Sequence, residues 1–201
     1  KRENDLVLGT FGRGFYVLDD YSPLRKLSKE SLESKAKIFP IKDALAYVES
    51  NPLGLRGVGS QGASMYAAPN PEFGATFTYF VKDKPKSPKD KRQEEENKAK
   101  ENKEDIDYPT YEEFVAEDNY EDAYLLFVIK DEKGSEVRKI KHSATTGINR
   151  VTWNLRYPPA TPIRTSAEKV GRYSNPNEGP LALPGKYTVE LWQSTNGSLQ
   201  K

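Results

Sequence analysis

The sequence has no cysteine and only one histidine, and these two absences exclude several kinds of chemistry. Without cysteine there is no disulfide, no thiolate nucleophile and no zinc site built on cysteine. With His142 as the only histidine, a metal site built on a pair of histidines is excluded as well. His142 lies in the polar stretch KIKHSATTG, where we predict a solvated histidine in a loop.

The sequence also lacks a long hydrophobic run and an excess of charge of either sign. The 31 lysines and arginines nearly balance the 30 aspartates and glutamates, giving a net charge of +1. This balance points neither to a nucleic acid nor to an anionic membrane as a partner. No apolar run approaches the roughly 20 residues that a membrane-spanning helix needs. Because the chain opens with neither a methionine nor a signal peptide, we expect it to be a piece of a longer protein.

The glycine-rich stretch LVLGTFGRGFYVLDD, residues 6–20, does not have the spacing of a phosphate-binding loop. Its glycines follow the order G-x-x-G-x-G, whereas dinucleotide loops read G-x-G-x-x-G and P-loops read G-x-x-x-x-G-K-[ST]. A phosphate loop also needs a helix after its glycines, but the segment from Phe15 to Leu18 is aromatic and β-branched and favours a strand. We therefore predict a β-hairpin with Gly12 and Gly14 supplying the positive φ of its turn.

Turn and helix signals follow the hairpin. Pro23 after a capping Ser22 predicts one or two short helical turns within residues 21–35. Residues 36–48 favour an extended segment, and residues 49–72, rich in glycine and proline, favour a loop.

The composition changes sharply at residues 82–107, which hold nine basic and nine acidic side chains and almost nothing apolar. Such a segment cannot contribute to a core, so we predict a solvated helix or a disordered arm. Ser87 followed by Pro88 is typical of a helix start. Thr110 and Glu113 have the spacing of a capping box and predict a second, short helix.

Several segments alternate between apolar and polar residues as half-buried strands do. They are residues 73–82, two strands within 123–140, 147–156 and 183–194. Short strands separated by turn signals, without a long apolar helix, predict a mainly β fold and, more specifically, an antiparallel β-sandwich. Along the strand 147–156, Val151, Trp153 and Leu155 share one parity, so we predict that all three face the core.

Two parts of the sequence resemble bacterial sortilin-like proteins of the BNR-repeat, glycosyl-hydrolase-like group. NDLVLGTFGRGFYVLDDYSPLRKL resembles the end of their propeller, and GINRVTWNLRYP and GPLALPGKYTVELW resemble their C-terminal immunoglobulin-like domain. The resemblance implies three parts: a terminal propeller hairpin with a short helix (1–27), a connecting segment (28–72), and an immunoglobulin-like or fibronectin-like β-sandwich (73–201) with a charged insertion (82–118). It also implies export to the periplasm, the cell surface or the medium.

The chain departs from this group at two points. The usual histidine of the first motif is Phe11 here, and no S-x-D-x-G-x-T-W Asp-box occurs. No catalytic residue, cofactor or metal ligand of the group can be matched. The expected function is that of a non-catalytic accessory module that packs on, or presents, the propeller of its own parent chain. The alternative is a part of a glycoside hydrolase that contributes to substrate or carbohydrate binding, with protein or carbohydrate as a partner.

The remaining candidates for chemistry are few. Asp19 and Asp20 are neighbours on a strand end and point to opposite faces, so they cannot form the carboxyl pair of a glycosidase, and we predict that they cap a turn. Arg13 at the hairpin tip is a candidate contact for an anionic ligand. Trp192, which alternates outward from Leu191, is a candidate for stacking on a sugar ring.

Overall fold

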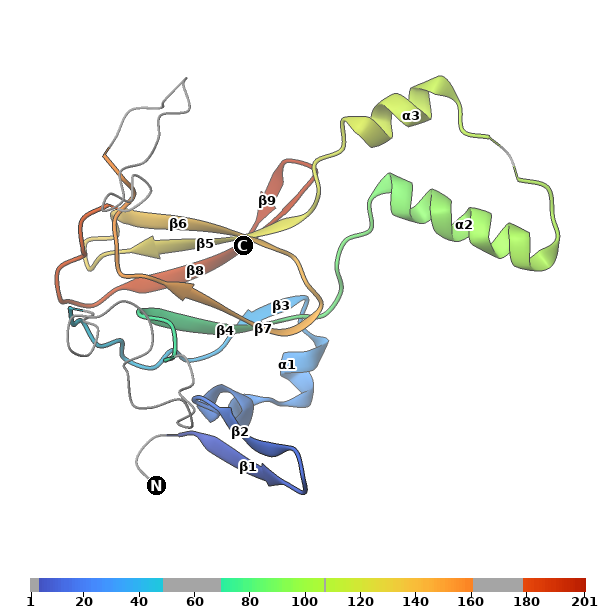
Figure 1. Ribbon diagram of the computed structural model, residues 1–201. Coiled ribbons are helices and arrows are strands. Elements are labelled where there is room, and N and C mark those ends of the chain that lie inside the picture. The colour runs from blue at the N-terminus through green and yellow to red at the C-terminus, as the bar shows by residue number, and fades with distance from the viewer. Residues whose placement is uncertain (1–3, 49–69, 107, 161–178) are drawn as a thin grey trace, which may run out of the picture. The chain divides into compact units, whose positions relative to one another are not determined.

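The computed structural model describes residues 4–48, 70–106, 108–160 and 179–201, and in these ranges the protein is mainly β with antiparallel strand pairs (Figure 1). The chain divides into two compact units. Unit 1 consists of Lys1–Leu27, Phe39–Thr78 and Arg150–Pro184, and unit 2 of Ser28–Ile38, Tyr79–Asn149 and Gly185–Lys201. The predicted loop at residues 49–72 lies mostly outside the described residues.

The elements, in chain order, are β1 (Leu6–Thr10), β2 (Gly14–Leu18), the 3₁₀ helix η1 (Ser22–Lys26), α1 (Lys29–Glu33), β3 (Ala36–Ile38), β4 (Ala75–Val81), α2 (Pro88–Asn102), α3 (Tyr111–Asp118), β5 (Tyr124–Lys130), β6 (Glu136–Ser143), β7 (Gly147–Trp153), β8 (Thr188–Thr195) and β9 (Ser198–Gln200).

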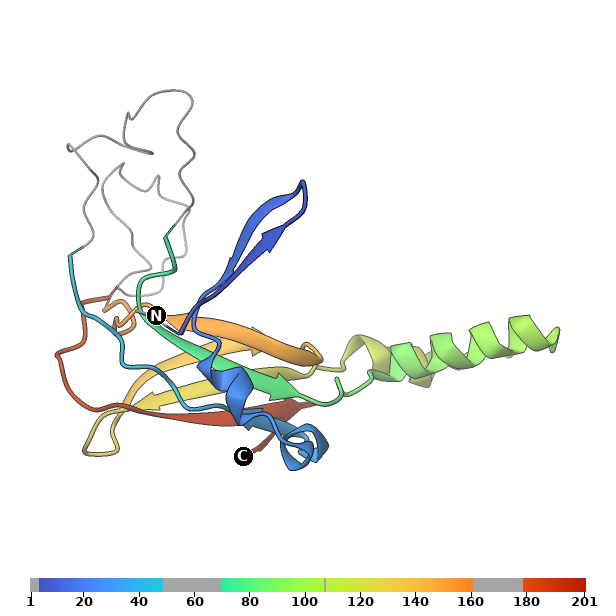
Figure 2. The same ribbon diagram turned by 90° about the horizontal axis from the view of Figure 1, so that it is seen from below.

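Strands β1 and β2 form the predicted hairpin. They pair antiparallel from Leu6–Leu18 to Thr10–Gly14, and Gly14 has a φ of +86° that suits glycine at the end of the turn. Within the described residues the hairpin is a two-stranded sheet of its own, as the separate blue ribbon in Figure 2 shows. Every residue of both strands is exposed, so the hairpin contributes no side chain to a core.

The helical turns predicted within residues 21–35 are present as η1 and α1, but their caps differ from the prediction. Pro23 lies in the first turn of η1, as expected, whereas the N-cap residue is Tyr21 rather than Ser22. Ser22 lies inside the helix, and its hydroxyl donates to Oδ1 of Asp20 over 2.6 Å. Helix α1 is capped by Ser28, whose side-chain oxygen accepts a hydrogen bond from the backbone N–H of Ser31.

The core of unit 2 is built around strand β5. The order of its sheet is β6-β5-β8-β9, so β5 is paired on both sides. The alternating residues Leu125, Phe127 and Ile129 are almost completely buried, and the ring of Phe127 meets the ring of Tyr79 edge-on with 5.0 Å between centroids. The predicted strand–turn–strand over 123–140 is confirmed, whereas the short edge strand β9 was not predicted.

The prediction of a solvated loop for His142 is wrong. His142 lies in β6 opposite Leu125, and therefore on the face of the sheet that carries the buried side chains. Its Nδ1 lies 3.0 Å from the hydroxyl of Tyr79, and burial raises the pKa of that hydroxyl. The stretch KIKHSATTG is polar because β6 is an edge strand with one outward face, and its alternation marks a strand rather than a loop.

Strands β3, β4 and β7 form a three-stranded antiparallel sheet, in that order. Trp153, the last residue of β7, is only 2% exposed, and its indole N–H donates to the backbone oxygen of Arg156 over 3.0 Å. The predicted burial of Trp153 is therefore confirmed. Leu155, however, lies beyond the end of β7 with a φ of +54°, so the parity argument that placed it beside Val151 and Trp153 does not apply.

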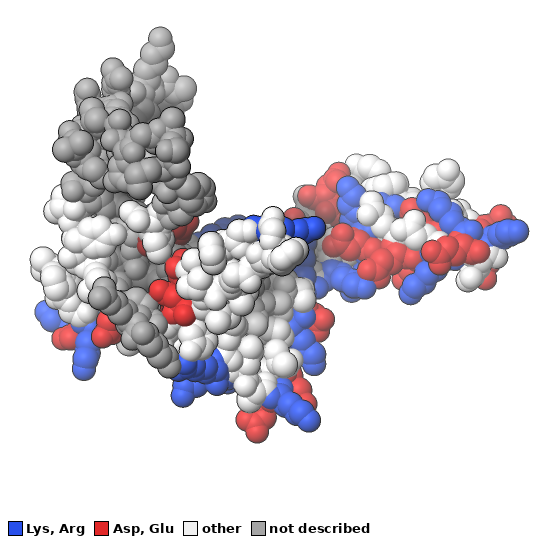
Figure 3. Space-filling view, turned by 60° about the horizontal axis from the view of Figure 1, so that its bottom comes forward, with Lys and Arg blue, Asp and Glu red and all other residues white. Residues whose placement is uncertain are grey.

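The charged insertion contains the helices α2 and α3, so the helical alternative of the prediction is the one present in the described residues. The predicted helix start at Ser87 and the predicted capping box of Thr110 with Glu113 are confirmed, and Ser87 also forms a capping box with Asp90 at α2. Neither helix has a buried residue. Figure 1 shows α2 and α3 side by side, and Figure 3 shows positive and negative side chains interspersed along them.

We expect Trp153→Ala to lower the free energy of unfolding by about 3–5 kcal/mol, because it removes a buried indole and leaves a cavity. Trp192→Ala is the matched control, since its indole is only half-buried, and its effect should be clearly smaller. Urea unfolding followed by circular dichroism measures both. Equal losses would show that Trp153 is not a core residue in solution.

Candidate functional site

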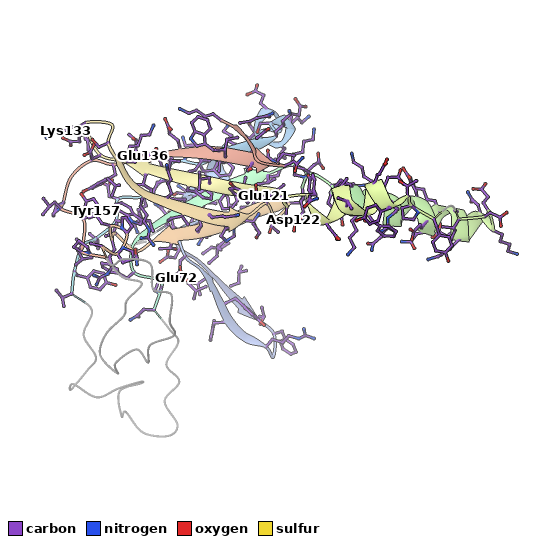
Figure 4. The ribbon with its side chains drawn as sticks, turned by 90° about the horizontal axis from the view of Figure 1, so that it is seen from above. Glu72, Glu121, Asp122, Lys133, Glu136 and Tyr157 are labelled. Atoms are coloured by element: carbon purple, nitrogen blue, oxygen red, sulfur yellow. The ribbon has the colours of Figure 1, made fainter. Side chains whose placement is uncertain are left out.

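Unit 1 contains a cleft of about 780 Å³ whose charged lining residues are mostly acidic. Two cations, Lys42 and Arg150, line it together with five carboxylates, those of Asp5, Asp19, Asp20, Asp43 and Glu72. Figure 3 shows acidic side chains gathered at a hollow of the surface, and Figure 4 labels Glu72 on the segment that leads to β4. The cleft is therefore the candidate binding site of unit 1.

Two of these carboxylates close the base of the hairpin. Asp20 has a φ of +43°, and its backbone N–H donates to Oδ1 of Asp5 over 2.9 Å. The carboxylate of Asp20 in turn accepts from the backbone N–H and the hydroxyl of Ser22. The predicted turn-capping role is confirmed for Asp20.

The other side of the cleft is formed by β4, β7 and two aromatic rings. The guanidinium of Arg150 donates to the backbone oxygen of Asp20 over 2.8 Å, and the hydroxyls of Thr76 and Thr152 lie 3.0 Å apart. Tyr47 and Phe73 meet edge-on with 4.9 Å between their centroids. This combination of carboxylates, hydroxyls and an aromatic edge suits a ligand that carries hydroxyl or ammonium groups.

Among the described residues, the cleft holds no cluster of metal ligands. In the ranges that the structure covers, no set of three or more histidines, aspartates and glutamates is placed to hold a metal ion. His142 belongs to unit 2, where its side chain meets the hydroxyl of Tyr79 rather than a serine or threonine nucleophile. Likewise, none of the helices in the described ranges has the length and apolar character to span a membrane.

The two ligand contacts predicted from the sequence belong to different units. Arg13 lies in the exposed turn between β1 and β2 of unit 1, as expected for a hairpin tip. Trp192 lies half-buried in β8 of unit 2, and its indole N–H donates to Oε2 of Glu190 over 3.3 Å. The ammonium of Lys201 lies 5.7 Å from the centre of the indole. Both roles stay predictions.

No sequence pattern indicates the charged cluster around Glu190 that includes Trp192. Glu190 accepts from Lys130 over 2.9 Å and from Lys201 over 2.6 Å. These hydrogen bonds, together with the indole N–H of Trp192, lower the pKa of Glu190 to about 2. Lys130 and Glu190 are 60 residues apart, so only knowledge of the β5–β8 register could have brought them together.

Compared with protein-family models, with curated proteins and with solved structures, the chain has no significant match.

We expect Glu190→Gln to destabilise the protein at neutral pH and to lose this effect in acid. The folded-state pKa of Glu190, about 2, lies below its ordinary value of 4.5. The carboxylate therefore stabilises the fold fully above pH 4.5, and this contribution disappears as the pH falls from 4.5 through about 2. Thermal midpoints of the wild type and the variant, measured from neutral pH to pH 2, should converge on acidification.

The control for this experiment is Glu33→Gln, since Glu33 is exposed in α1 and has no ion pair among the described residues. This variant should leave the midpoint unchanged. A constant difference between wild type and Glu190→Gln at all pH values would show that the carboxylate is not held by its two lysines.

Proposed function

We propose that this chain is a non-catalytic accessory module at the C-terminal end of an exported bacterial protein with a sortilin-like, BNR-repeat propeller. In this proposal the β1–β2 hairpin belongs to the last blade of that propeller. The rest of the chain packs on the propeller or presents it outside the cell. The partner is thus the propeller of the same parent chain.

The observation that carries the proposal is the exposure of the hairpin's apolar side chains on both faces. Val7 and Val17 are cross-strand partners, yet they are 60% and 59% exposed. On the other face, Leu8 and Tyr16 are paired and are more than half exposed. A two-stranded ribbon is marginally stable in water, and a strand with a free edge is a site for pairing with another strand. Both properties are those expected of a blade fragment whose neighbouring strands lie elsewhere.

The proposal includes an immunoglobulin-like or fibronectin-like β-sandwich for the remaining strands. The contacts of Tyr79 support it, because this residue of β4 meets Phe127 of β5 and His142 of β6 within unit 2. A strand from one sheet thus packs on the buried face of another, which is the packing that defines a sandwich. The antiparallel pairing of both sheets agrees with this architecture.

One observation favours the alternative that the chain contributes to substrate or carbohydrate binding in a glycoside hydrolase. The acidic cleft of unit 1 offers carboxylates, threonine hydroxyls and the ring of Tyr47, which are groups that bind sugar hydroxyls and ring faces. Specific binding of an oligosaccharide in isothermal titration, abolished by Tyr47→Ala, would favour this alternative over a purely accessory role.

Leu8→Ala tests the proposal by comparing two contexts. In this chain the leucine is already half exposed, so we expect a loss below about 1 kcal/mol. In the parent protein, where the proposal buries it between blade strands, we expect about 2–5 kcal/mol. Chemical unfolding of the chain and of the parent measures the two losses.

Leu199→Ala is the matched control, since Leu199 is a leucine of β9 that is 49% exposed. It should have the same small effect in both contexts. If Leu8→Ala is equally mild in the parent, the hairpin has no partner strands there and the propeller assignment fails.

A further inference from the structure

The segment that contains α3 differs in charge from the helix that precedes it. Residues 104–122, EDIDYPTYEEFVAEDNYED, contain nine carboxylates and no lysine or arginine. Residues 82–103, which contain α2, have nine basic and six acidic side chains. Although the whole chain is nearly neutral, residues 104–122 therefore carry a strong negative charge at one end of unit 2.

The acidic segment also exposes apolar side chains that the fold does not use. Tyr108 and Tyr111 are 92% and 82% exposed, and Val115 is exposed as well. Tyr111, Val115 and Asp118 follow the i, i+4, i+7 spacing, so they lie along one stripe of α3. An exposed stripe of this kind, bordered by charges, marks a surface that contacts another molecule.

A different face of α3 is occupied by α2. The guanidinium of Arg92 donates to both carboxylate oxygens of Glu117, over 2.7 and 2.9 Å, and it lies 5.4 Å from the centre of the Phe114 ring. Arg92 also pairs with Glu96 on its own helix. This bidentate contact fixes the orientation of α3 on α2. At about 100° per residue, Glu117 lies at least a third of a turn around the helix from Tyr111 and Val115, whereas Phe114 borders their stripe.

Most of the carboxylates at the stripe are not neutralised by an ion pair with another described residue. Among the described residues, Glu112 and Asp118 take part in no ion pair, whereas Glu121 lies 3.6 Å from Lys141. Figure 4 shows Glu121 and Asp122 where the chain enters β5, at the opposite end of the sheet from Lys133 and Glu136. The negative potential of residues 104–122 is thus only partly neutralised from within unit 2.

We propose that the stripe of Tyr111, Val115 and Asp118, with Tyr108 and Glu112 beside it, is a docking surface for a lysine- and arginine-rich segment of another protein. Guanidinium groups stack on tyrosine rings and pair with carboxylates, and apolar side chains of the partner cover Val115. A nucleic acid or an anionic membrane would be repelled by the same charges. The inference does not depend on the propeller assignment.

A short fluorescein-labelled peptide in which arginine and leucine alternate is a suitable probe for the full chain. We expect fluorescence anisotropy to show binding that weakens steeply with added salt, because the contact is largely electrostatic. The same peptide with glutamate in place of arginine should not bind. Failure of the arginine peptide to bind would overturn the proposal.

Two variants locate the surface. Glu112→Gln combined with Asp118→Asn removes two charges without changing shape, and Tyr111→Ala removes the stacking ring; each should weaken binding about tenfold. Circular dichroism verifies that the helices remain. The matched control is Glu95→Gln combined with Glu101→Gln, which removes the same charge from exposed positions of α2.

The control decides between a defined surface and a general effect of charge. If Glu95→Gln with Glu101→Gln weakens binding as much as the α3 variants, the peptide is attracted by net charge and the proposal is overturned. Sedimentation of the unlabelled chain tests whether a second copy of the chain occupies the stripe instead. Concentration-dependent dimers that Tyr111→Ala abolishes would assign the stripe to that second copy and overturn the proposal as well.

Discussion

The pairing of β5 on both of its sides is the constraint on which unit 2 depends. With β6 on one side and β8 on the other, β5 satisfies its backbone hydrogen bonds while Leu125, Phe127 and Ile129 enter the core. The ring of Tyr79 brings β4 onto that same face. His142 can lie half-buried because the Tyr79 hydroxyl, itself buried, meets its ring nitrogen, so this polar pair is satisfied from within the core.

The chain places a notable share of its apolar side chains outside any core. Only 35% of its residues are hydrophobic, yet the hairpin β1–β2 and the stripe on α3 leave valines, leucines and aromatic residues in water. Folding of the described residues gains little from the exposed parts of these side chains. Their exposure is explained most simply by contacts with other molecules or with other parts of a parent protein, and this reasoning underlies both proposals made for the chain.

Local sequence signals were sufficient where the structure is set by neighbouring residues. The hairpin turn at Gly12 and Gly14, and the capping boxes at Ser87 and Thr110, involve partners within a few positions. The errors arose where long-range contacts decide: His142 belongs to a strand because of its pairing with β5. The cleft and the cluster around Glu190 could not be predicted, since each joins segments whose register the sequence alone does not reveal.

The two unpartnered surfaces differ in chemistry, and this difference indicates different kinds of contact. The hairpin offers free strand edges and apolar side chains on both faces, so the proposed contact is one with further strands that forms as the protein folds. The α3 stripe offers ring faces and carboxylates on a helix whose backbone is already satisfied. A contact there forms between folded partners, is steered by charge and weakens with salt. The two proposals thus describe a permanent contact at β1–β2 and a reversible one at α3.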